Sequence, residues 1–128
     1  MNELRHLPAV GSTDAQPVHS DASSWFGYDD AHYSRKTIEI TGDLANAYDS
    51  DDPVFVVEVL YGTNRGGQIN VWVNEESSLE HIWKPATIDG ESYRKADEVN
   101  FMSWEPARRE YAELDDASDV NDLMVRNA

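Results

Sequence analysis

Residues 54–74 read VFVVEVLYGTNRGGQINVWVN, and this stretch decides the fold. Its first part, residues 54–61, is apolar on both faces except at Glu58, which is typical of a central strand covered on both sides. Residues 62–67 have the composition of a turn, and residues 68–74 alternate between polar and apolar side chains. The stretch therefore predicts a β-hairpin.

The register of this hairpin follows from pairing Tyr61 with Gln68 across the turn. Because successive strand residues point to opposite faces, this pairing sorts the side chains into two sets. One face then carries Val54, Val56, Glu58, Leu60, Ile69, Val71 and Val73, and the other carries Phe55, Val57, Val59, Tyr61, Gln68, Asn70, Trp72 and Asn74.

Weaker patterns flank the hairpin on both sides. Residues 36–41 alternate with period two and predict a half-buried strand that Gly42 ends. One helical turn is expected over residues 43–48, before the acidic loop of residues 49–52. Asp89-Gly90 predicts a tight turn between strands at residues 86–88 and 92–94, and residues 79–83 form a short element of undefined type.

The C-terminal region has a helical pattern. Ser103 is a suitable N-cap, and Pro106 is tolerated in a first helical turn. An apolar stripe with helical spacing follows at Ala107, Tyr111, Leu114 and Ala117, and it extends through Val120, Leu123 and Met124. The predicted class is α+β, with an antiparallel sheet of four to six strands and a C-terminal helix or helix pair on one face.

The apolar residues also divide the chain into two parts. Residues 36–104 hold 17 of the 26 Leu, Ile, Val and Phe residues, whereas residues 1–24 hold four of them among Pro, Gly and Ser. A segment so poor in apolar side chains cannot build a core. We therefore expect a flexible N-terminal arm at residues 1–24 and a single α+β domain at residues 25–128.

The charge restricts the partners. The chain has 128 residues with 25 Asp and Glu against 10 Lys and Arg, a net charge of −15. Direct binding to nucleic acid or to an anionic membrane is not expected, because both would repel this charge. Without a secretory apolar segment or cysteine, the chain is expected to be cytoplasmic and not exported. The oligomeric state stays open.

The motifs of metal, nucleotide and catalytic sites are incomplete. A calcium loop that starts at Asp49 would need Gly and Glu where the chain has Val54 and Leu60. The four histidines have no short repeated spacing, and residues 62–67 lack the end of a phosphate-binding loop. We therefore predict no metal, no cofactor and no catalytic residue, and hence no enzyme.

Glu58 is the carboxylate that the hairpin pattern places on an apolar face. An isolated ion would be costly there, so the side chain must be paired, protonated or near the sheet margin. A structural pairing with Arg or Lys competes with a role as a catalytic acid. No second carboxylate or histidine has a predictable position beside Glu58, which favours the structural role.

Two groups of residues are candidates for binding a partner. Four Asp residues recur along the C-terminal helix and would form a row of carboxylates with steps of about 4.5 to 6 Å; the alternative is an ordinary solvated helix face. Trp72 either packs under the C-terminal helix or stands out as an anchor. Residues 25–33 mix aromatic with acidic side chains, and they form either an N-terminal strand on the sheet or a patch that becomes ordered on a basic partner. The candidate contacts are Asp115, Asp116, Asp119, Asp122, Trp72, Trp25, Tyr28, Asp29 and Asp30.

The favoured function is an acidic inhibitor that mimics nucleic acid and occupies a basic, nucleic-acid-binding surface of a partner protein. Anti-restriction and anti-CRISPR proteins of phages and mobile elements are of this type. One alternative is an immunity protein that neutralises a basic nuclease toxin. Another is a halophile-adapted or viral assembly subunit, whose acidity serves solvation.

Overall fold

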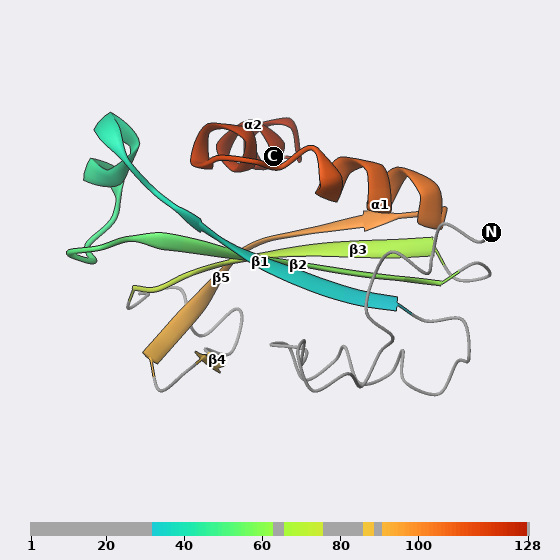
Figure 1. The fold of residues 1–128 in the computed structure, drawn as a ribbon, viewed down its shortest axis with the longest axis horizontal. Coiled ribbons are helices and arrows are strands. Elements are labelled where there is room, and N and C mark those ends of the chain that lie inside the picture. The colour runs from blue at the N-terminus through green and yellow to red at the C-terminus, as the bar shows by residue number, and fades with distance from the viewer. Residues whose placement is uncertain (1–31, 63–65, 76–85, 89–90, 128) are drawn as a thin grey trace.

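The computed structural model describes residues 32–62, 66–75, 86–88 and 91–127. In chain order the elements are β1 (His32–Glu39), the 3-10 helix η3 (Gly42–Ala47), β2 (Val54–Gly62), β3 (Gly66–Val73), β4 (Ala86–Ile88), β5 (Glu91–Phe101), α1 (Trp104–Ala112) and α2 (Ala117–Asn127). The strands form one antiparallel sheet in the order β1-β2-β3-β5-β4, and both helices cover the same face of it (Figure 1). The α+β class with a C-terminal helix pair is thereby confirmed.

Most of the predicted elements are present with shifted bounds. Strand β1 begins four residues before the predicted strand at residue 36, and η3 forms the expected helical turn. Strands β4 and β5 pair across residues 89–90, with Ile88 opposite Glu91. The predicted N-terminal arm, the start of the domain at Trp25 and the element at residues 79–83 lie outside the described residues.

The predicted register of the β2–β3 hairpin is wrong by one residue. Tyr61 pairs with Gly67 and not with Gln68, and Gly62 pairs with Gly66. A shift of one residue moves every side chain of a strand to the other face. Trp72 therefore lies opposite Val56, on the same face of the sheet as Glu58.

The register has its cause in the two glycines that begin β3. Gly66 has a positive φ of 87°, which favours glycine, and it belongs to the strand and not to the turn. A Cβ atom on Gly67 would collide with the Cβ of Ala107 in α1. The absence of a side chain at Gly67 thus lets α1 lie directly on β3.

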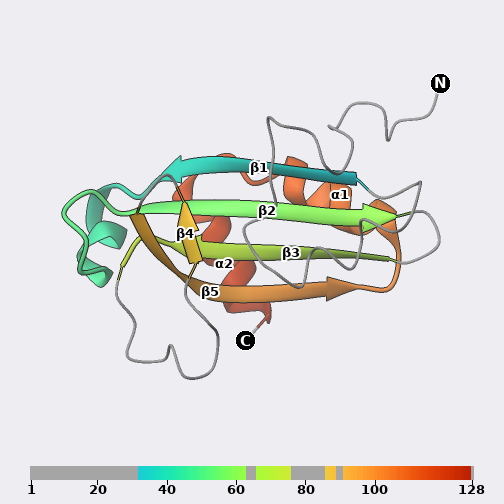
Figure 2. The same ribbon diagram turned by 90° about the horizontal axis from the view of Figure 1, so that it is seen from below.

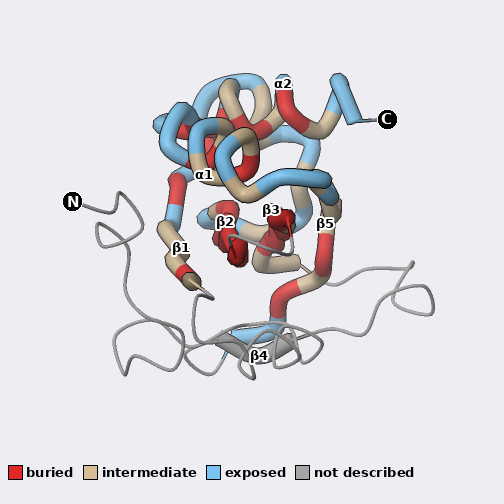
Figure 3. Tube along the Cα trace, turned by 90° about the vertical axis from the view of Figure 1, so that its right-hand side faces the viewer, coloured by how far each residue is buried: buried red, intermediate tan, exposed pale blue. Residues whose placement is uncertain are grey.

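The main core fills the space between the sheet and the helices. Strands β2 and β3 supply its centre, and Figure 3 shows them buried beneath both helices. The buried members of this core are Ile38, Ile40, Phe55, Val57, Val59, Tyr61, Ile69, Val71, Val73, Ala107, Tyr111, Leu114, Ala117, Val120 and Leu123. The predicted apolar stripe is therefore real, although it is shared by two helices.

The opposite face of the sheet is also buried at its centre. Val56, Trp72 and Tyr93 form a second apolar cluster there. Glu58, Asn70 and Lys95 are polar but are buried as well. Strand β2 is thus covered on both faces, as the composition of residues 54–61 predicts.

Helix α2 crosses the sheet from β1 to β5 (Figure 2). Near its start, Lys36 of β1 donates to the backbone oxygen of Tyr111 at the end of α1. At its end, the Asn127 side chain donates to Asp97 Oδ1 at 3.0 Å and to the backbone oxygen of Glu98 at 3.2 Å on β5. The Lys36 contact holds the end of α1 against β1, and the Asn127 contacts hold the end of α2 against β5.

Candidate functional site: an acidic turn between the helices

The end of α1, the linker and the start of α2 carry a dense group of carboxylates. We define the acidic turn as residues 113–122, which contain five Asp and Glu and no Lys, Arg or His. Four of these side chains are exposed, and Asp119 is partly exposed. The five acidic residues are Glu113, Asp115, Asp116, Asp119 and Asp122.

The prediction that four Asp residues form a row on one helix is wrong. Asp115 and Asp116 precede α2, so only Asp119 and Asp122 lie on it. Asp115, Asp116 and Asp122 are exposed and Asp119 is partly exposed. The regular spacing of a single helix does not apply to all four. The reason is that α1 ends at Ala112 and the chain changes direction before Ala117.

Asp116 and Asp119 cap the start of α2. The backbone amide of Asp119 donates to Asp116 Oδ1 at 3.0 Å, and Asp119 Oδ2 accepts from the amides of Asp116 at 3.2 Å and Asp115 at 3.0 Å. This reciprocal pattern is a capping box with Asp at both positions. The backbone amides of Asp115 and Asp116 hold the pKa of the Asp119 carboxyl below its usual value. These bonds hold the turn in one conformation.

Lys36 of β1 contacts Tyr111, two residues before the acidic turn. Its Nζ donates to the backbone oxygen of Tyr111 at 2.8 Å and lies 4.4 Å from the centre of the Tyr111 ring. Partial burial lowers the pKa of Lys36, and the charges of Asp115 and Asp119 act in the opposite direction. The cation is thus placed at the C-terminus of α1, where the helix dipole favours positive charge.

The charge of the described segments is strongly negative, and nearly all of the charged residues lie at the surface. These segments hold 17 Asp and Glu against 7 Lys and Arg. Several of the cations are in ion pairs: Arg94 with Glu75, Lys95 with Glu98, Arg109 with Glu105 and Arg126 with Glu110. A partner would therefore meet mainly carboxylates on these surfaces.

Glu58 lies at the centre of a buried polar cluster. Its Oε2 accepts from the Tyr33 hydroxyl at 2.8 Å, and its Oε1 accepts from Asn70 Nδ2 at 3.0 Å and from Trp72 Nε1 at 3.1 Å. Three donors satisfy a carboxylate that is fully buried. The side chain is neither at the sheet margin nor beside a second acid in this cluster. The contacts support a structural role.

Trp72 is 1% exposed and belongs to the interior. Of the two predicted alternatives, exposure as an anchor does not fit this burial, and packing under the C-terminal helices is wrong because the helices cover the other face. The one-residue error in the register caused this misplacement. The other predicted aromatic and acidic contacts lie outside the described residues; they are Trp25, Tyr28, Asp29 and Asp30.

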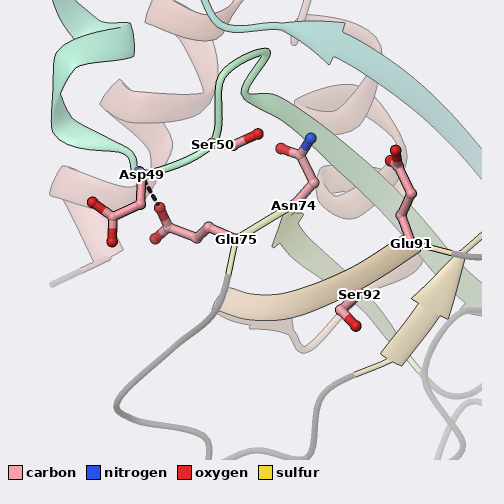
Figure 4. Close-up of a pocket in the computed structure, with 6 residues that line it drawn as sticks. All are labelled: Asp49, Ser50, Asn74, Glu75, Glu91 and Ser92. Atoms are coloured by element: carbon pink, nitrogen blue, oxygen red, sulfur yellow. Dashed lines mark hydrogen bonds between the residues drawn. The ribbon is translucent and has the colours of Figure 1, made fainter.

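A cavity of about 500 Å³ lies at the end of the sheet where β3 ends and β5 begins (Figure 4). Asp49 and Glu91 stand at opposite sides of it. Glu75 is engaged within the protein, since it accepts from Arg94 Nε at 2.7 Å and from the Asp49 amide at 2.9 Å. The remaining lining residues are Ser50, Asn74 and Ser92.

The polar residues of this cavity hold the acidic loop in place. The Asn74 side chain accepts from the Val54 amide at 2.8 Å and donates to the backbone oxygen of Asp52 at 3.1 Å. Burial raises the pKa of Tyr48 beside this loop, with Arg94 opposing and Glu75 adding to the effect. Within the described part of the chain, no three His, Asp or Glu side chains are placed to hold a metal ion.

Comparison with known proteins assigns the chain to no family. No protein-family model, no curated protein and no solved structure matches the chain. Among the described helices, none is long and apolar enough to cross a membrane.

Proposed function

We propose that this chain is an acidic binding protein whose acidic turn occupies a basic, nucleic-acid-binding surface of another protein. The acidic turn itself carries the proposal: five carboxylates within ten residues, four of them exposed, with Lys36 directed at the backbone of Tyr111. A groove lined by Lys and Arg that evolved to bind phosphates would attract such a surface. Occupying that groove would inhibit the partner.

The structure indicates which carboxylates can be changed without disturbing the fold. Asp116 and Asp119 cap α2, so changing them would mix a loss of charge with a loss of helix stability. Glu113, Asp115 and Asp122 are exposed and lie outside this reciprocal pair. The turn variant is therefore Glu113→Gln, Asp115→Asn and Asp122→Asn.

A matched control removes the same charge elsewhere. Asp43, Asp51 and Asp52 are exposed on η3 and on the loop after it. The loop variant changes all three to Asn and leaves the acidic turn intact. Both variants raise the net charge by three, so a difference between them reports position and not total charge.

We expect the immobilised parent protein to capture basic nucleic-acid-binding proteins from a cell lysate, and a short DNA duplex to displace them. The loop variant should retain this set, and the turn variant should lose most of it, because only the turn variant lacks the contact carboxylates. Mass spectrometry of the three captured sets makes the comparison. Equal capture by both variants, or complexes that the duplex does not release, would contradict the proposal.

A further inference from the structure

Lys36 is a cation next to the acidic turn, whose proposed role is to attract the cations of a partner. On charge alone it weakens that attraction, because it offsets one of the neighbouring carboxylates. Its position suggests another role. The Nζ atom contacts the backbone oxygen at the end of α1 and lies over the Tyr111 ring, while Asp115 and Asp119 beside it belong to the linker and the start of α2.

Two further contacts join this site to the sheet. The Tyr111 hydroxyl lies 3.3 Å from Ser34 Oγ on β1, and the backbone oxygen of Tyr111 also accepts from the Leu114 amide at 3.1 Å. Tyr111 and Leu114 are both buried in the main core. The end of α1 is thus held against β1 at the ring, the hydroxyl and the carbonyl of one residue, and Lys36 makes two of these contacts.

We propose that Lys36 is a positioning residue for partner binding, which holds the acidic turn against β1 in the orientation that the partner recognises. This inference rests on the proposed function. It predicts that the orientation of the carboxylates contributes more to affinity than the single positive charge subtracts. Removing Lys36 should then weaken binding even though the protein becomes more negative.

The test compares Lys36→Met with Arg109→Gln, which removes one positive charge from an exposed position on α1. In the free protein, hydrogen exchange at the amides of Asp115, Asp116 and Asp119 should accelerate by about tenfold or more in Lys36→Met. The reason is that loss of the charged hydrogen bond to Tyr111 makes local opening of the adjoining acidic turn easier. Exchange in Arg109→Gln should match the parent, and Lys36→Arg should restore much of the protection.

The binding arm uses the DNA-displaceable protein that the parent captures. Lys36→Met should bind it at least several-fold more weakly than the parent, whereas Arg109→Gln should bind as tightly or more tightly. Parent-like exchange in Lys36→Met, or tighter binding by both variants, would overturn the inference. If no such protein is captured, the proposed function fails, and the exchange measurement alone decides whether Lys36 positions the turn.

Discussion

Replacing Glu58 with Leu is expected to lower the free energy of unfolding by about 3–5 kcal/mol, because each buried donor that loses its acceptor costs about 1–3 kcal/mol. The Leu side chain would leave the Tyr33 hydroxyl, Asn70 Nδ2 and Trp72 Nε1 without the acceptor that they share. An unsatisfied donor in the interior costs more than the hydrogen bond contributes. Urea denaturation followed by circular dichroism measures the change.

Glu58→Gln is the matched control, because it keeps the shape and one carboxamide oxygen. That oxygen can still accept from Asn70 and Trp72, and the Tyr33 hydroxyl can turn to accept from the new amide. We expect a loss of about 1–2 kcal/mol for this variant. A Glu58→Leu protein as stable as the parent would show that the cluster is not needed for folding.

Trp72→Ala is expected to destabilise the protein by about 3–5 kcal/mol, because the indole is buried and its removal leaves a cavity. It also removes one donor to Glu58. Trp72→Phe keeps most of the apolar volume and loses the indole N–H, so its cost should be smaller, about 1–2 kcal/mol. Thermal unfolding of both variants, followed by circular dichroism, gives the comparison.

A binding measurement on Trp72→Ala distinguishes a buried, structural Trp72 from a Trp72 that contacts the partner. The part of the Trp72→Ala population that remains folded should still bind the partner, since the indole is buried on the face of the sheet opposite the helices. A Trp72→Ala variant that unfolds at the parent's midpoint but no longer binds would show that the indole is a contact residue, contrary to its burial.

The architecture could be predicted from the sequence because alternation and helical spacing act locally. Residues 54–61 and the apolar stripe after Ser103 lead directly to β2 and to the helix pair. The hairpin register could not be predicted in this way. Gly66 and Gly67 have the composition of a turn, and their place in β3 depends on the packing of α1 at Ala107, which is a long-range contact.

The candidate site could be predicted in part. The carboxylates of residues 115–122 are evident in the sequence, but the position of the break between α1 and α2 is not, because the apolar stripe continues through Leu114 and Ala117. Asp116 followed three residues later by Asp119 was a signal of a helix start. Lys36 had no such signal, since its contact with Tyr111 joins residues 75 positions apart.

The polar cluster around Glu58 could not be predicted for a different reason. With Trp72 and Asn70 assigned to the opposite face, no donor had a predictable position beside the carboxylate. The corrected register places both on the face of Glu58, and Tyr33 joins them from β1. The error of one residue in the hairpin register therefore prevented the prediction of both the partners of Glu58 and the position of Trp72.

The proposed function requires that the acidic turn makes the electrostatic contact with a basic partner. The association rate of the captured protein, measured by surface plasmon resonance from about 20 to about 500 mM salt, tests this claim. The parent's rate should fall by about tenfold or more across this range, and at low salt the turn variant should associate several-fold more slowly than the loop variant. A rate independent of salt, or equal rates for the two variants, would contradict the claim.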